Sequence, residues 1–122
     1  MKKINLFISQ LEDFINELLK THFTNEPKAI FLKNSINLFK RTSPKMILDN
    51  FNKSIMIFKD RILNEDESLL LNPSDEVDNN HLSIIEPLQT LWKKPDFPDN
   101  DKKAIWNYLK VLVILADKIN NE

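Results

Sequence analysis

The two histidines, His22 and His81, are the side chains of this sequence best suited to acid–base catalysis or metal binding near neutral pH. They stand in different segments, and the chain has no cysteine that could complete a thiolate metal site with them. An isolated histidine is most simply a residue at a helix end near solvent. We therefore expect neither histidine to act in catalysis or to bind a metal.

Two arrangements of acidic side chains resemble functional patterns without meeting their physical requirements. Asp75 and Glu86 stand at the first and twelfth positions of a calcium-binding loop, but Val77 takes the third loop position, where a ligand is required, and the turn glycine is missing. Adjacent acids such as Glu12 and Asp13 act as acid and base only in a cleft that raises one pKa, and nothing in the sequence predicts such a cleft. We expect no enzymatic activity, no cofactor and no small-molecule substrate.

The chain contains no glycine, although about eight or nine would be usual for its 122 residues. Phosphate-binding loops, dinucleotide-binding turns and nucleophile elbows use glycine because their backbone adopts positive φ or approaches a ligand closely. Tight β-hairpin turns favour glycine for the same reason. The composition therefore argues against these sites and against a β-rich fold, and we expect asparagine to end several helices in the left-handed conformation.

Apolar residues recur at intervals of three and four along most of the chain, as they do on one face of an α-helix. Pro27 and Pro44 each follow a break in this pattern and suit the first turn of a new helix, with Ser43 placed to cap the second of these helices. The sequence predicts an all-α fold, a compact bundle of about five helices that forms a single domain over residues 1–122. The expected helices span 4–23, 27–41, 44–64, 81–93 and 99–120.

The charge is strongly polarised along the chain, although the net charge is only −1. Residues 65–80 hold six acids and no base, which predicts an acidic loop in which 69–71 dock back onto the bundle as a turn of helix. Residues 20–61 hold nine bases and three acids. This basic segment favours nucleic-acid binding as an alternative function, unless the acidic loop neutralises it within the molecule. The candidate nucleic-acid contacts are Lys28, Lys33, Lys40, Arg41, Lys45 and Lys53.

Two of the expected helices are apolar on more than one side. In the second helix, Leu32 and Ile36 share one face, while Phe31 and Leu38 lie toward the opposite side. We favour burial of both sides of this helix over an exposed patch. The last helix is apolar on two sides as well, which makes it the expected central helix. The residues that would bind a partner, if these second sides are exposed, are Phe31, Leu38, Trp92, Trp106 and Val113.

The sequence does not predict insertion into a membrane. Its most apolar run covers 105–116, which is well short of the roughly twenty residues needed to span a bilayer. Polar residues recur from Asn5 onward, so the beginning of the chain does not resemble a signal peptide. Because there is no cysteine to form disulfides, we expect an intracellular protein.

The C-terminal part of the chain combines Leu91-Trp92, a polar stretch over 99–103, the run Ile105-Trp106-Asn107-Tyr108-Leu109 and the apolar stretch 112–116. This combination resembles the ending of small helical proteins of nucleocytoplasmic large DNA viruses, and it covers about a quarter of the chain. The resemblance implies a viral protein located in the cytoplasm of the host cell or in the virion. It assigns no functional residue.

Together, these patterns predict a non-enzymatic helical protein that acts as a protein-interaction or structural component. We expect its partner to be another protein or a second copy of this chain, bound through an apolar helix face. A nucleic-acid-associated protein that uses the basic surface of residues 28–61 is the alternative.

Overall fold

The computed structural model describes residues 2–71 and 85–121. These residues contain no β-strand, which confirms the predicted all-α fold. The elements in chain order are α1 (Lys2–Thr21), α2 (Pro27–Thr42), α3 (Pro44–Ser54), the 3-10 turn η1 (Met56–Phe58), α4 (Lys59–Leu63), α5 (Ser68–Leu71), α6 (Ile85–Trp92) and α7 (Asp99–Asn120).

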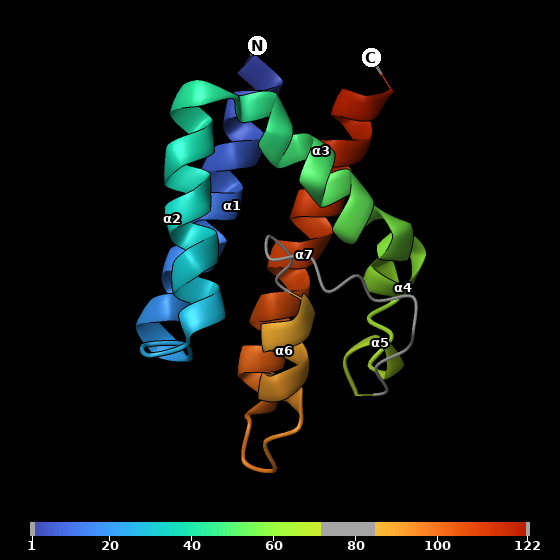
Figure 1. The fold of residues 1–122 in the computed structure, drawn as a ribbon. Coiled ribbons are helices and arrows are strands. Elements are labelled where there is room, and N and C mark those ends of the chain that lie inside the picture. The colour runs from blue at the N-terminus through green and yellow to red at the C-terminus, as the bar shows by residue number, and fades with distance from the viewer. Residues whose placement is uncertain (1, 72–84, 122) are drawn as a thin grey trace.

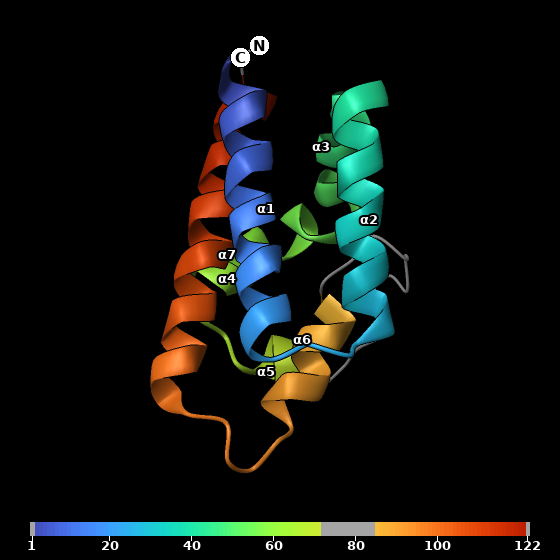
Figure 2. The ribbon, with the colours of Figure 1, turned by 90° about the vertical axis from the view of Figure 1, so that its left-hand side faces the viewer.

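The long helix α1 lies between α2 and α7 and runs antiparallel to both (Figure 1, Figure 2). From the end of α2, α3 runs obliquely across the bundle toward α4 and α5, and α5 packs against α6 (Figure 1). This arrangement leaves α2 at the edge of the bundle (Figure 2). One cluster of buried apolar side chains joins residues from α1 through α7.

The first three helices begin and bury their apolar faces much as the sequence predicts. Pro27 and Pro44 open α2 and α3, and the Glu26 side chain accepts a hydrogen bond of 3.4 Å from the Lys28 backbone N–H. Ser43 occupies the capping position of α3, but its side chain makes no capping hydrogen bond. Instead, its backbone N–H donates to Phe39 O and closes α2. The buried face of α1 consists of Ile4, Phe7, Ile8, Leu11, Phe14, Ile15 and Leu18.

The prediction of one continuous helix over 44–64 is wrong, because the helix is interrupted between α3 and α4. Ser54 Oγ donates a hydrogen bond of 2.9 Å to the carbonyl oxygen of Asn50, a type of contact that competes with regular helix geometry and bends the chain. The Phe58 N–H then bonds to Ile55 O, three residues back, so the backbone tightens into a 3-10 turn. Ile55 and Phe58, at the two ends of the interruption, are both buried.

Asparagine ends α4 and α7, at Asn64 and Asn121, but neither residue has the expected left-handed conformation; the left-handed residue after α4 is a glutamate. Glu65 has φ of 51° and is the one non-glycine residue with positive φ in the described ranges. Its N–H bonds to Ile62 O, and the N–H of Asp66 bonds to Arg61 O, which satisfies carbonyls at the helix end. Next, Asp66 Oδ1 accepts hydrogen bonds from the backbone and the side chain of Ser68 at the start of α5.

The predicted turn of helix over 69–71 is confirmed as α5, and the expected helix over 81–93 is described only as α6. Leu69 and Leu70 are buried, so α5 docks onto the bundle as expected. Residues 72–80 of the expected acidic loop lie outside the described residues. Pro87 falls within the first turn of α6, where a proline is tolerated.

A buried side-chain hydrogen bond links α6 to α5. Gln89 is 6% exposed, and its Nε2 donates to Leu69 O at 3.1 Å. Gln89→Leu leaves that carbonyl without its partner and is expected to lower the free energy of unfolding by about 1–3 kcal/mol in urea denaturation. As a control, Asn107→Leu on the exposed side of α7 is expected to change it by less than about 0.5 kcal/mol. Equal effects of the two substitutions would contradict a structural role for the Gln89 amide.

Glu65 connects the turn after α4 to α7. Its Oε2 accepts hydrogen bonds from Lys103 Nζ, at 2.8 Å, and from Lys110 Nζ. The hydrogen bond from Lys103, followed by that from Lys110, lowers the pKa of Glu65 below its ordinary value of 4.5. Because the folded state has the lower pKa, this contact stabilises the fold fully above about pH 4.5 and is lost as the pH falls through the lowered pKa.

We expect Glu65→Gln to lower the melting temperature by a few degrees at pH 7, and this difference from the wild type to disappear near pH 2. Thermal unfolding followed by circular dichroism at both pH values checks this. The pKa of Asp66 is also lowered, mainly by its hydrogen bond with Ser68. Because Asp66 is unchanged in Glu65→Gln, the loss of stability in acid that comes from Asp66 is the same in the wild type and in the variant. A difference that persists unchanged at low pH would show that the charge of Glu65 is not the cause.

Candidate interaction surface

The structure brings one of the two histidines close to a carboxylate from a distant part of the chain. His22, after the end of α1, has its Nε2 3.9 Å from Asp101 Oδ2 in the first turn of α7. Its ring packs edge-on against Phe97, with centroids 5.2 Å apart. The separation of 3.9 Å is too long for a hydrogen bond, so His22 and Asp101 do not form a catalytic dyad in this geometry.

Metal binding finds no support in the part of the chain that the structure describes. No group of three or more histidine, cysteine, aspartate or glutamate side chains there could hold a metal ion. His81 and the residues of the calcium-like pattern from Asp75 onward lie outside the described residues, apart from the backbone of Glu86 in α6.

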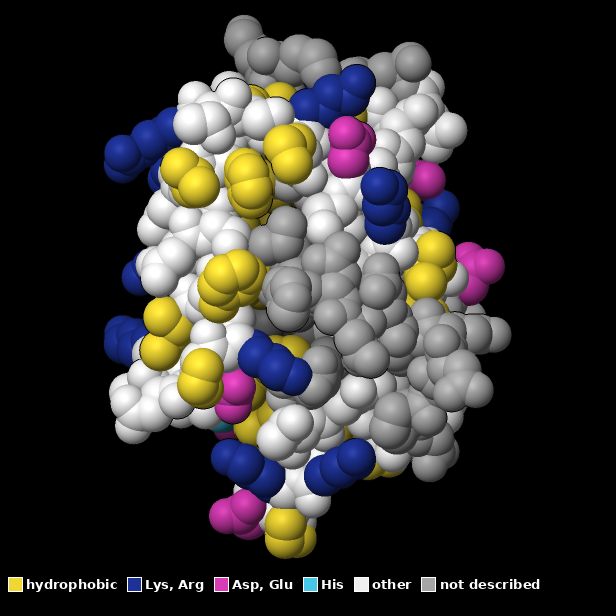
Figure 3. Space-filling model, in the orientation of Figure 1, with side chains coloured by type: hydrophobic (Ala, Val, Ile, Leu, Met, Phe, Trp, Pro, Cys, Tyr) yellow, Lys and Arg dark blue, Asp and Glu magenta, His cyan; other side chains and the backbone are white. Residues whose placement is uncertain are grey.

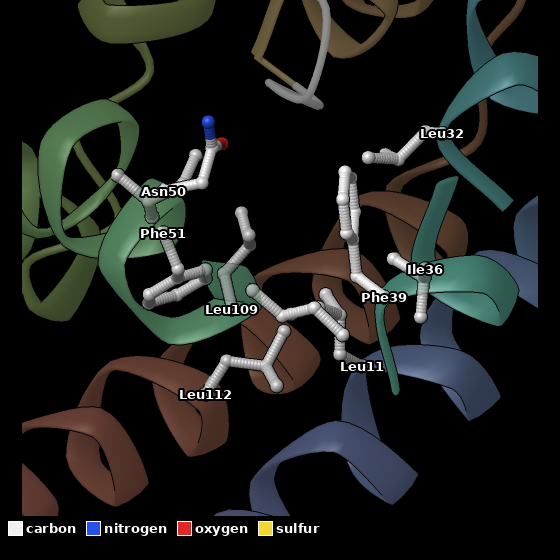
Figure 4. A pocket seen from close by; sticks show the side chains of 10 residues that line it. Leu11, Leu32, Ile36, Phe39, Asn50, Phe51, Leu109 and Leu112 are labelled. Carbon is white, nitrogen blue, oxygen red and sulfur yellow. The ribbon is translucent and has the colours of Figure 1, made fainter. Parts of the chain in front are cut away.

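A small apolar hollow lies between α1, α2, α3 and α7 (Figure 4). Leu32 and Phe39 form one wall, and Asn50 and Phe51 face them from α3. Its volume is about 30 Å³, which is room for one or two water molecules. Asn50 supplies the only polar side chain among its lining residues. A hollow this small and apolar offers no site for a polar substrate.

Three of the five candidate partner-binding residues are corrected by the structure, because they belong to the core. Trp92, Trp106 and Val113 are no more than 3% exposed. The two indole rings pack edge to face, with centroids 5.6 Å apart, and Phe97 packs against Trp92 at 5.3 Å. Both apolar sides of α7 that the sequence indicated are therefore buried, while Val111 and Ile114 leave a third, outer side 42% and 44% exposed, so α7 is not enclosed on all sides.

The other two candidates, Phe31 and Leu38, are 51% and 58% exposed. The expectation that both sides of α2 are buried is wrong. Leu32 and Ile36 face the core, where α1 and α3 pack against α2, whereas the opposite side of this edge helix points away from the bundle. In Figure 3, hydrophobic side chains run down the left-hand side of the molecule, where α2 lies, with Lys and Arg side chains at their margins.

We use the name α2 surface for the exposed apolar and basic side chains on this side of the molecule. Its apolar members are each at least 41% exposed, and Met46 adds a residue from the first turn of α3. Its basic members are also exposed and form no ion pair in the described ranges. The α2 surface consists of Ile30, Phe31, Leu38, Met46, Arg41 and Lys45. Lys33 is exposed too, but it lines a small hollow with Glu12 and Ile15 of α1, so it lies on the α1 side of α2.

The remaining bases proposed as nucleic-acid contacts are also at the surface, but they are less well placed for a common ligand. Lys40 Nζ forms an ion pair of 2.8 Å with Glu12 of α1, which neutralises its charge. Lys28 is exposed at the first turn of α2, and Lys53 is exposed near the end of α3. Sequence reasoning found these bases individually, but it could not foresee that Glu12 partners one of them.

The fold and this surface define an all-α bundle with one edge helix that exposes both apolar and basic side chains. Comparison of the chain with protein-family models, characterised proteins and solved structures found no significant match. Among the described helices, none has the length and apolar character needed to cross a membrane.

Proposed function

We propose that this protein is a non-enzymatic interaction component that binds another protein through the α2 surface. The exposure of Phe31 and Leu38 on a helix whose opposite face is fully packed is the observation that carries this proposal. The core does not need these two side chains, because Leu32 and Ile36 already fill the contact with α1 and α3. Exposed apolar side chains gathered on one helix mark interaction sites in soluble proteins.

The composition of the α2 surface also suits protein recognition. Aromatic side chains, methionine and arginine are enriched in protein interfaces, and Phe31, Met46 and Arg41 supply one of each. We place the protein inside the cell, in the viral setting that its C-terminal pattern implies. That setting rests on the sequence resemblance alone.

A photo-crosslinking experiment tests the proposal. A benzophenone amino acid is placed at Leu38, and in a matched control at Ile114 on the outer side of α7, which is also exposed. In extract of the native cells, we expect a discrete crosslinked protein from position 38 and none from position 114. Equal crosslinking from both positions, or none from either, would overturn the proposal.

Nucleic-acid binding is the second candidate, favoured by the exposed bases Lys33, Arg41, Lys45 and Lys53. If it is correct, a DNA or RNA oligonucleotide binds at low salt and its affinity falls steeply between about 50 and 200 mM salt. Such binding would depend on the bases and not on Phe31 and Leu38. The absence of binding at low salt would remove this candidate.

A further inference from the structure

The charge of the α2 surface has a single sign. Residues 27–48 contain five bases and no acid. The one carboxylate that the structure brings to these bases by a described ion pair is Glu12, on Lys40 at the side of α2 that faces α1. The apolar members of the α2 surface are thus bordered by positive charge from Arg41 and Lys45.

The spacing of the apolar side chains suits a helical partner. Phe31 and Leu38 are seven residues apart, or about two helical turns, so they form a stripe roughly 10 Å long on one side of α2. Asn34 lies on the same side between them, and Arg41 lies one turn beyond Leu38. An amphipathic helix docks against such a stripe through apolar residues spaced by three, four or seven positions.

Charge argues against a second copy of the chain as the occupant. In a two-fold dimer through the α2 surface, the same patch would face itself, so Arg41 and Lys45 of one copy would approach those of the other. Juxtaposition of like charges opposes association, whereas opposite charges at the rim speed and orient it. The complementary partner carries carboxylates beside its apolar residues.

Resting on the function proposed above, we propose that the α2 surface binds an acidic amphipathic helix of another protein. The apolar face of that helix covers Phe31, Leu38 and Met46. Its aspartate and glutamate side chains lie opposite Arg41 and Lys45.

Three fluorescein-labelled peptides of about 18 residues test this proposal by fluorescence anisotropy. The acidic peptide carries leucine at helical spacing with glutamate on its flanks. The second peptide has lysine in place of glutamate, and the third has serine in place of leucine. At about 50 mM salt, we expect the full-length protein to bind the acidic peptide at least tenfold more tightly than either of the others, and to lose affinity as salt rises.

Charge reversal on the protein supplies the decisive comparison. Arg41→Glu and Lys45→Glu together are expected to reverse the preference, so that the lysine peptide binds more tightly than the acidic one. The matched control reverses two exposed bases elsewhere, Lys93→Glu and Lys94→Glu, with the same change in net charge. This control is expected to keep the preference of the wild type. Loss of the preference in both variants would overturn the proposal.

Other outcomes identify other occupants. If the lysine peptide binds the wild type more tightly and depends on Phe31 and Leu38, the acidic partner is wrong while the proposed function stands. Equal binding of the serine peptide, or tighter binding of a single-stranded DNA 20-mer, would overturn the proposal in favour of a polyanion.

A dimer in sedimentation that is lost on Leu38→Ser would make a second copy the occupant. If replacing Asp75, Glu76 and Asp78 by their amides raises the affinity for the acidic peptide roughly tenfold, the occupant of the α2 surface is this acidic segment of the chain itself and not another protein.

Discussion

Replacing Phe31 and Leu38 together by serine is expected to weaken binding of the protein partner roughly a hundredfold, with little effect on folding. A hundredfold loss corresponds to about 2.7 kcal/mol, which two interface anchors that each contribute 1–2 kcal/mol can supply. Both side chains are more than half exposed in the free protein, so their removal takes little apolar area out of the folded core. Affinity measured by titration, together with thermal unfolding by circular dichroism, checks both parts.

The matched control removes two apolar side chains from the outer side of α7. Val111 and Ile114 are 42% and 44% exposed, so Val111→Ser with Ile114→Ser is a comparable change at a different surface. We expect this variant to bind the partner like the wild type. Equal loss of binding in the two double variants would mean that general surface hydrophobicity, not the α2 surface, drives the interaction.

The second prediction concerns Trp106, which the structure moves from the candidate surface into the core. Trp106 is 2% exposed and packs edge to face against Trp92. Trp106→Ala removes a large buried side chain and leaves a cavity between α6 and α7, which is expected to lower the free energy of unfolding by about 3–5 kcal/mol. Urea denaturation followed by circular dichroism measures this loss.

A loss of this size is a large part of the 5–15 kcal/mol that stabilises a typical domain, so Trp106→Ala unfolds at much lower urea. Trp106→Phe fills part of the same space and is expected to recover a good part of the loss. If Trp106→Ala folds as stably as the wild type but loses its partner, the residue is an exposed anchor and the described packing is wrong.

Local sequence patterns predicted where the helices lie better than they predicted which elements pack against each helix. The three-and-four spacing of apolar residues in α1 and the prolines that open α2 and α3 are local signals, and the structure confirms them. The interruption between Ile55 and Phe58 was missed, because the two residues keep a helical spacing in the sequence while the backbone between them changes geometry.

The outward face of α2 shows a limit of the same reasoning. Phe31 in α2 and Trp106 in α7 both lie off the main apolar face of their helix, and the sequence treats them alike. Their exposure differs because Trp92 of α6 packs against Trp106, whereas α2 lies at the edge of the bundle and Phe31 is 51% exposed there. The position of a helix within a bundle depends on contacts between distant segments, which periodicity does not report.

The ionic contacts could not be predicted for the same reason. Glu65 reaches Lys103 and Lys110, 38 and 45 residues away, and Lys40 reaches Glu12 across 28 residues. The sequence indicated a basic segment and an acidic one. It did not indicate which bases are neutralised by a partner within the fold and which are exposed to bind one.

The most direct test of the α2 surface is the mapping of backbone amide chemical shifts while the acidic amphipathic peptide is added to the full-length protein. We predict that the largest changes fall within residues 27–46, which cover α2 and the first turn of α3. Changes centred on the outer side of α7, around Val111 and Ile114, or spread evenly over the molecule, would contradict the claim that α2 is the binding surface.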